Sequence, residues 1–180
     1  MSVNKNFANV FENMQQIVED RQNGVRMTDS VIIFDDKFNP LSVGYQCDIV
    51  LEGVMFASAD HALQYLRAMA FQDQAAMRQI ASAATAKQAK TVLINRFSNN
   101  TWRKFEHRSM QVVIGAKVKQ NKTAREHLKM TGTKKLVYAS KHDTYFGCGL
   151  AMNDDNVLYP QFWAGQNQLG HILEQYRKVL

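Results

Sequence analysis

Apolar positions recur with helical spacing through most of the chain, which predicts a largely helical protein. The first such pattern lies before Asn23-Gly24 and places six apolar residues on one helical face: Phe7, Val10, Phe11, Met14, Ile17 and Val18. Capping residues and apolar periodicity predict further helices over residues 58–71, 73–83, 85–95, 102–120, 123–132 and 168–180. Capping boxes are expected at two of these starts: Thr85 with Gln88, and Thr123 with Glu126.

Short runs of β-branched and aromatic residues predict a small sheet. Strands are expected over residues 30–34 and 135–140, with a hairpin over 48–56 that turns at Glu52-Gly53. Residues 141–165 are expected to be mostly loop. The sum is a mostly helical α+β single domain with a small β-sheet, in which an N-terminal helix within residues 1–29 packs on a main domain of residues 30–180.

Composition excludes several protein classes. The 180 residues are 46% hydrophobic, which suffices for a core, and no apolar run approaches the length of a membrane span. The N-terminus lacks the pattern of a signal peptide. Only Cys47 and Cys148 are present, so a disulfide framework is not expected and a reducing cytoplasm is the simplest location. The spacing of cysteines and histidines does not match a structural zinc site.

Positive charge is concentrated in the second half of the chain. Residues 1–90 carry 8 Lys+Arg and 10 Asp+Glu, whereas residues 91–180 carry 14 and 6. From Arg96 to Lys141 the sequence has 12 Lys+Arg and only two acidic residues, Glu106 and Glu126. This excess favours a phosphate-bearing partner. A lysine-rich solvated surface without a partner explains it equally well.

A glycine-flanked segment, Gly165-Gln166-Asn167-Gln168-Leu169-Gly170, precedes the last predicted helix. Asn167 is of the residue type that caps helix N-termini. The first turn of a helix presents unpaired N–H groups and the positive end of the macrodipole, and glycines let a phosphate approach them. The segment therefore indicates a phosphate site, with an ordinary capped helix as the alternative.

Polar residues line one side of the helix predicted after Ser58. Asp60, Gln64 and Arg67 lie at i, i+4 and i+7, and His61 is adjacent. An acid, an amide, a guanidinium and an imidazole beside an apolar stripe suit the wall of a cavity. The alternative is a solvent-exposed ion-pair ladder.

Three residues elsewhere in the sequence each allow two interpretations of their role. Lys117 falls on the apolar stripe of its helix, so it either extends its ammonium to the surface, which we expect, or is buried with a lowered pKa. Asp143 is either an Asx-turn residue or a site carboxylate. Trp102 is either a core residue or a stacking surface for a base.

Taken together, these motifs resemble the NADAR family over about residues 34–180. The matching features follow in order along the chain: Asp60-His61; Trp102, Met110 and Lys117; Thr131 before Leu136-Val137; the loop from Asp143 through Phe146 and Gly147 to Gly149; and Gly165, Asn167, Leu169 and Gly170. Known members of that family include N-glycosidases that act on riboflavin-pathway intermediates and glycohydrolases that remove ADP-ribose from guanine bases. The resemblance implies a related fold and chemistry.

This chain departs from the family pattern where the chemistry is expected. Asp60 stands for a glutamate, Arg67 for a lysine, Tyr138 for a glutamate and Phe146 for a tryptophan; Ser42-Val43 replaces a Ser-Asn pair. In active relatives the lysine is thought to attack or stabilise the ribose C1 carbon. A guanidinium cannot act as a nucleophile, although it binds carboxylates and phosphates bidentately.

Two functional hypotheses follow from the resemblance. In the first, the protein hydrolyses the N-glycosidic bond of an ADP-ribose-like or nucleotide ligand, with Asp60, Arg67 and Asp143 as catalytic candidates and without a metal or redox cofactor. The residues expected to contact the ligand are His61, Trp102, Lys117, Phe146, Gly147, Asn167 and Gly170.

In the second hypothesis, catalysis is weak or lost, and the protein binds a nucleotide, an ADP-ribosylated nucleic acid or a host protein. Relatives of this size occur in phages, where such a role would make sense. A membrane partner is not expected under either hypothesis.

Overall fold

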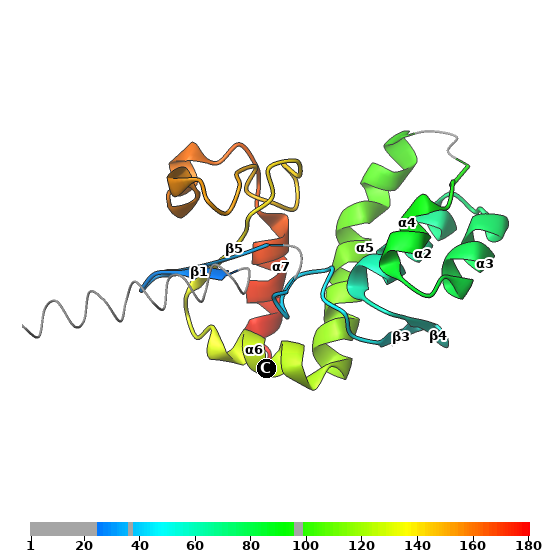
Figure 1. The fold of residues 1–180 in the computed structure, drawn as a ribbon, viewed down its shortest axis with the longest axis horizontal. Helices are drawn as coiled ribbons and strands as arrows, with labels where there is room; N and C mark the ends of the chain where they lie inside the picture. The colour runs from blue at the N-terminus through cyan, green and yellow to red at the C-terminus, as the bar shows by residue number, and fades with distance from the viewer. Residues whose placement is uncertain (1–24, 36–37, 96–98) are drawn as a thin grey trace, which may run out of the picture. The chain divides into compact units, whose positions relative to one another are not determined.

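The computed structural model of the chain describes residues 25–35, 38–95 and 99–180 (Figure 1). The helix predicted within residues 1–29 therefore lies largely outside the described residues. Chain packing divides the protein into two compact units: residues 1–42 with 131–171, called unit 1, and residues 43–130 with 172–180, called unit 2. The predicted α+β class with a helical majority and small sheets is confirmed.

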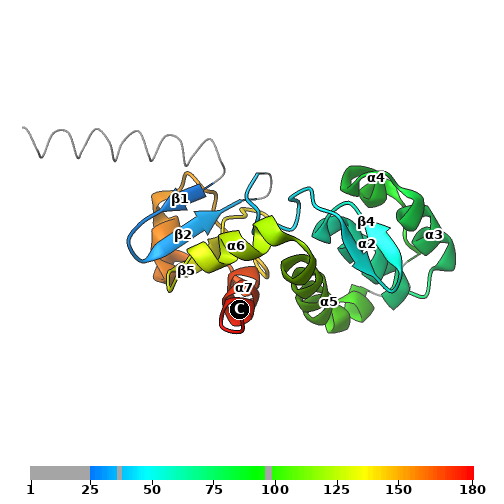
Figure 2. The same cartoon turned by 90° about the horizontal axis from the view of Figure 1, so that it is seen from below.

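Unit 1 is built on a three-stranded sheet in the order β1-β2-β5 (Figure 2). Its strands are β1 (Val25–Met27), β2 (Val31–Phe34) and β5 (Lys135–Tyr138). β1 pairs antiparallel to β2, and β2 pairs parallel to β5. Two short 3-10 helices, η1 (Asp155–Leu158) and η2 (Pro160–Phe162), follow the loop after β5. The core is a cluster of small and β-branched residues: Ile33, Val137, Ala139, Cys148 and Val157.

Unit 2 is mainly helical. It contains the hairpin β3 (Ile49–Leu51) and β4 (Val54–Phe56), followed by α2 (Ala59–Ala70), α3 (Gln74–Ser82), α4 (Ala86–Thr91), α5 (Asn99–Gln120) and α6 (Lys122–Met130). The last helix, α7 (Gln168–Arg177), begins in unit 1, and its residues from Ile172 belong to unit 2. The hairpin turns as predicted, because Glu52 and Gly53 both adopt positive φ angles, 50° and 77°.

Side-chain caps fix most of the helix starts in unit 2. Ser58 Oγ accepts from the His61 N–H at 3.1 Å, and Asp73 caps α3 in the same manner. Thr85 Oγ1 accepts from the Gln88 N–H, and Gln88 Oε1 accepts from the Ala84 N–H, so the first capping box forms with a shift of one residue.

Some predicted boundaries were wrong. The capping box at Thr123 is not used, because Asn121 Oδ1 accepts from the Ala124 N–H and starts α6 earlier. α4 ends at Thr91 rather than near residue 95, and β1 was not predicted. Across the described residues, each helix is too short or too polar to cross a membrane.

Candidate functional site

Asp60 is a buried carboxylate in the first turn of α2, within unit 2. Its side chain is 12% exposed, and it forms an ion pair with Lys90 Nζ of α4 at 2.5 Å. A carboxylate withdrawn from water needs such a partner, and its place at a helix N-terminus adds favourable electrostatics. The structure therefore holds a negative charge at the start of α2. Lys90 was missed by sequence reasoning, because its spacing along the chain says nothing of its contact with Asp60.

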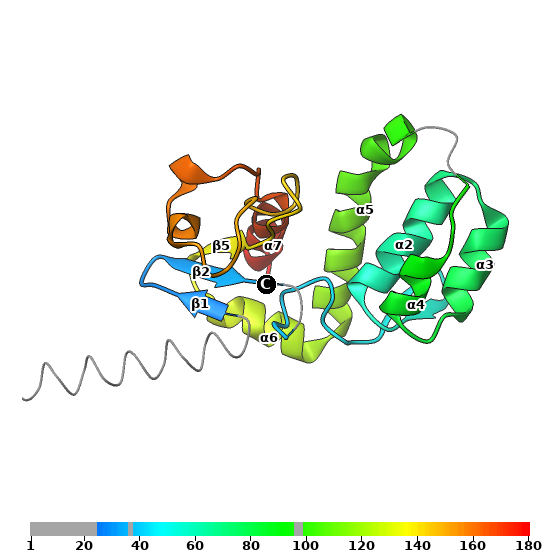
Figure 3. The same cartoon turned by 45° about the horizontal axis from the view of Figure 1, so that its top comes forward.

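Arg67 lies two helical turns beyond Asp60 and contacts an aromatic ring of α5. Its guanidinium carbon is 5.7 Å from the centre of the Trp102 ring, in a cation–π arrangement. α2 and α5 pack along each other, as Figure 3 shows. The acid and guanidinium thus share one helix, and the structure brings Trp102 to the guanidinium.

His61 has a structural role. Its ring is 1% exposed, Nε2 lies 2.7 Å from the Ile80 carbonyl oxygen, and Nδ1 lies 3.4 Å from the Ala57 amide nitrogen. The neutral tautomer with its proton on Nε2 satisfies both contacts, donating to Ile80 and accepting from Ala57. Both ring nitrogens of this predicted ligand contact are therefore already in use, and His61 connects the start of α2 to α3.

Lys117 is buried in α5, which corrects the expectation that it reaches the surface. The residue is 1% exposed, and Nζ lies 5.3 Å from the centre of the Tyr45 ring. Burial lowers the pKa of Lys117 to about 8, and the nearby Cys47 opposes this shift. Burial and the Lys117 charge also lower the pKa of His127. The amine is thus buried, and its pKa lies closer to neutral pH than that of an ordinary lysine.

Asp143 serves as an Asx-turn residue in unit 1. Its Oδ1 accepts from the N–H groups of Tyr145 and Phe146 at 3.0 and 2.7 Å. Phe146 is buried, with its ring edge-on to Tyr145. Gly147 is also buried and has no room for a Cβ, which would lie 2.7 Å from the Asp143 carbonyl oxygen. The loop is therefore held by local contacts, and the turn interpretation of Asp143 is confirmed.

The side chain of Asn167, the residue before α7, binds the backbone of β5. Its Oδ1 accepts from the Tyr138 N–H at 2.9 Å, and its Nδ2 donates to the Leu136 carbonyl at 2.8 Å. The residue is fully buried with a positive φ of 53°. Gly170 is required beside it, because a Cβ there would clash with the Leu136 carbonyl oxygen. Asn167 does precede α7 as predicted, and its carbonyl accepts from the His171 N–H, but its side chain bonds to the strand backbone and not to the first turn of the helix.

Five of the backbone N–H groups in the segment that was expected to hold phosphate are already paired within unit 1. The amides of residues 165–169 donate to the carbonyls of residues 144–148, although not in sequence order. The pairs are Gly165 to Cys148, Gln166 to Thr144, Asn167 to Gly147, Gln168 to Tyr145 and Leu169 to Phe146. Gln168 and Leu169 are the first two residues of α7. The predicted phosphate site at this helix start is therefore not supported, since a ligand would have to displace these bonds.

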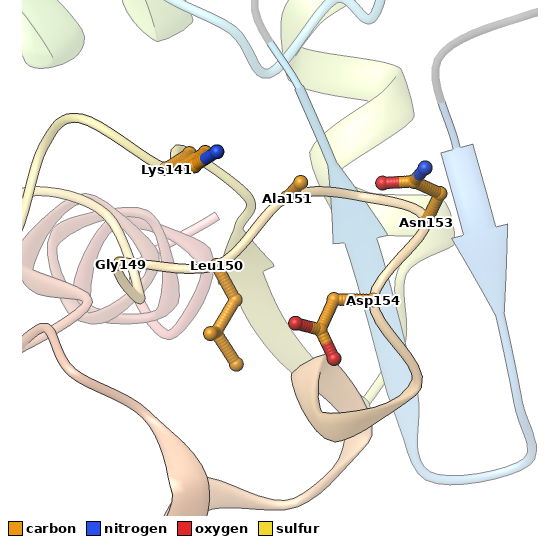
Figure 4. A pocket seen from close by; sticks show the side chains of 6 residues that line it. All are labelled: Lys141, Gly149, Leu150, Ala151, Asn153 and Asp154. Carbon is orange, nitrogen blue, oxygen red and sulfur yellow. The ribbon is translucent and has the colours of Figure 1, made fainter.

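A polar cavity of about 380 Å³ opens in unit 1, and the sequence analysis did not propose a ligand site there. It is lined by Lys141, Gly149, Leu150, Ala151, Asn153 and Asp154 (Figure 4). Asp154 Oδ1 also accepts from the Asn156 N–H and starts η1. A second, largely apolar groove of about 490 Å³ lies in unit 2 along α5, Arg125 and Tyr176. Among the described residues, His, Cys, Asp and Glu form no group of three able to hold a metal ion.

We expect Asn167→Asp to destabilise the protein. The variant would place a carboxylate oxygen against the Leu136 carbonyl and remove a buried donor, at a cost of about 3 kcal/mol in the free energy of unfolding. Urea denaturation measures this loss. Asn156→Asp, at an exposed asparagine of the same unit, is the matched control. Equal stability of the two variants would contradict the assigned role of Asn167.

A second prediction concerns pH. Between pH 8 and 10.5 the folded chain has released the Lys117 proton while the unfolded chain retains it, so the free energy of unfolding rises with pH across this window. The rise is on the order of 3 kcal/mol. Lys117→Met should remove it, whereas Lys119→Met, at an exposed lysine of the same helix, should retain it. Cys47 and Cys148, whose thiol pKa values are raised by burial, remain in both variants. Identical pH profiles for the two variants would refute the prediction.

Comparison with known proteins agrees with this architecture. The NADAR domain matches residues 13–180. The NMR structure of the E. coli protein YbiA has a TM-score of 0.65 and 22% sequence identity, and the match covers 89% of this chain and 90% of that chain. The two proteins thus share a fold. No curated protein matches the chain. Because the domain match spans nearly the whole sequence, this chain belongs to the NADAR family, a family of the N-glycosidase type.

Proposed function

We propose that the protein cleaves the N-glycosidic bond of an ADP-ribose-like or nucleotide ligand at the face of α2 that carries Asp60 and Arg67. The observation that supports this most directly is the ion pair between Asp60 and Lys90, which keeps a buried negative charge at the family's acidic position. The ligand would be a phosphorylated, ribose-containing small molecule or an ADP-ribosylated nucleic acid.

The chemistry requires charge stabilisation at the sugar. As the bond between C1 and the base nitrogen breaks, its electron pair leaves with the base, and positive charge develops on C1 and the ring oxygen. A carboxylate beside C1 stabilises that charge electrostatically. Water then adds to C1, and its proton neutralises the departing base. Asp60 would supply the negative charge, and the reaction needs neither a metal nor a redox cofactor.

Arg67 and Trp102 would hold the remainder of the ligand. A guanidinium binds phosphate through two parallel hydrogen bonds, and an indole presents a surface for stacking with a base. Their mutual contact fixes both side chains, because the guanidinium lies over the ring. Asp143, Phe146, Gly147, Asn167 and Gly170 would act indirectly, by holding the loops of unit 1.

We expect Asp60→Asn to lower the rate of base release by about 100-fold, because the variant keeps the shape of the side chain and loses its charge. Chromatography of free base released from a panel of nucleotides and ADP-ribosylated nucleosides measures this rate. Asp48→Asn, at an exposed aspartate of the same unit, should leave the rate unchanged. Absence of base release by the parent protein across the panel would reject the proposed activity.

A binding protein without turnover is the second candidate function, and Arg67 favours it. The family usually has a lysine at this position, and a guanidinium cannot be deprotonated to attack a sugar. Such a protein would retain nucleotide, ADP-ribosylated nucleic acid or a host protein as its partner.

Arg67→Lys distinguishes the two functions. If the natural protein is catalytically impaired, the variant should release base from a substrate that the parent only binds. Calorimetry with ADP-ribose establishes binding by both proteins, and Arg78→Lys, the same substitution at an exposed arginine of the same unit, serves as the control. Binding of ADP-ribose by neither protein would remove this second candidate.

A further inference from the structure

The N-terminal half of α5 carries an exposed phenylalanine with two cations beside it. Phe105 is 49% exposed, and Lys104 and Arg108 are also exposed. An aromatic ring beside positive charges offers a flat apolar surface together with groups that bind an anion. We call Lys104, Phe105 and Arg108 the α5 strip.

Helical spacing makes these side chains neighbours. Lys104 and Arg108 are four residues apart, and Phe105 and Arg108 are three apart, so their Cβ atoms lie within about 6 Å of each other. Trp102 precedes Phe105 by three residues, which puts the two aromatic side chains in succession along the helix. The strip therefore continues from the contact between Arg67 and Trp102.

Charge along α5 is strongly asymmetric. Over residues 99–120 the sequence has five Lys+Arg and a single acid, Glu106. Glu106 is less exposed than the cations of the strip. The strip thus presents positive charge with an aromatic face to an approaching ligand, and an anion with flat apolar groups complements it.

We propose that the α5 strip binds single-stranded nucleic acid, with one base stacked on Phe105 and the flanking phosphates on Lys104 and Arg108. Proteins bind unpaired strands through positive grooves combined with aromatic side chains on which bases stack. A duplex keeps its bases paired and inaccessible to such a ring. The inference goes beyond the proposed function, since it concerns an unmodified strand and depends on α5 alone.

Fluorescence anisotropy with a labelled 20-nucleotide oligo(dT) tests the proposal. Parent protein should bind the single strand more tightly than the matching duplex. Phe105→Leu keeps an apolar side chain and removes the stacking surface, so we expect it to weaken binding by about 10-fold. Thermal melting shows whether each variant remains folded.

The cations are tested by salt dependence. The double variant Lys104→Gln/Arg108→Gln removes two phosphate contacts, so the slope of log affinity against log salt concentration should fall by roughly 1.4. The control Lys119→Gln/Lys122→Gln removes two exposed charges elsewhere in the same unit and should leave most of the affinity intact.

Four results would each contradict strand binding by the α5 strip. They are no binding of the strand by the parent, equal affinity for duplex and single strand, parent-like binding by Phe105→Leu, and equal losses of affinity in the two double variants. Because anisotropy measures binding of the strand and not release of a base, these outcomes are separate from the test of activity. Strand binding without base release would support the α5 strip and contradict the proposed activity. Base release without strand binding would contradict the α5 strip alone.

Discussion

The buried side-chain amide of Asn167 organises unit 1. It bonds in both directions to the backbone of β5, and its close approach leaves room only for glycine at position 170. The amides of residues 165–169 donate to the carbonyls of residues 144–148 in the loop after β5, without the register of a strand pair. A motif that suggests anion binding at a helix start thus holds chain segments together, because paired N–H groups have no capacity left for a ligand.

Unit 2 depends on how its charged groups are buried. Asp60 is compensated by Lys90, and Arg67 lies against Trp102, so each polar group has a defined partner. Lys117 is different, because enclosure shifts its pKa downward and makes its neutral form accessible. These arrangements cost desolvation energy that apolar residues would avoid. The proposed chemistry would use the packed faces of α2 and α5.

The functional proposals divide between these two helices. The face of α2 offers a fixed negative charge and a guanidinium, which suits a ribose that carries phosphate. The outer surface of α5 offers cations around Phe105, which suits an extended strand. A ligand attached to nucleic acid would use both. Because Arg67 replaces the family lysine, a nucleophilic amine is missing at this position, which concerns catalysis. Binding of a phosphate is not affected, since a guanidinium also recognises phosphate.

Sequence by itself determined the features that depend on neighbours along the chain. Apolar periodicity located the helices, Glu52-Gly53 located the hairpin, and the order of short motifs identified the family. Grouping Asp60 with Arg67 was also predictable, because helical spacing alone places them on one face. These properties arise from interactions within a few residues, which sequence patterns express directly.

Tertiary structure decided the partner of each polar group. The pairing of Asp60 with Lys90, the engagement of both His61 nitrogens and the enclosure of Lys117 join residues that are distant in sequence. Asn167 is the clearest example, since the same side chain would cap a helix if no strand lay beside it. A hydrogen-bonding group takes the partner that packing brings within reach, and that partner is set by the fold as a whole.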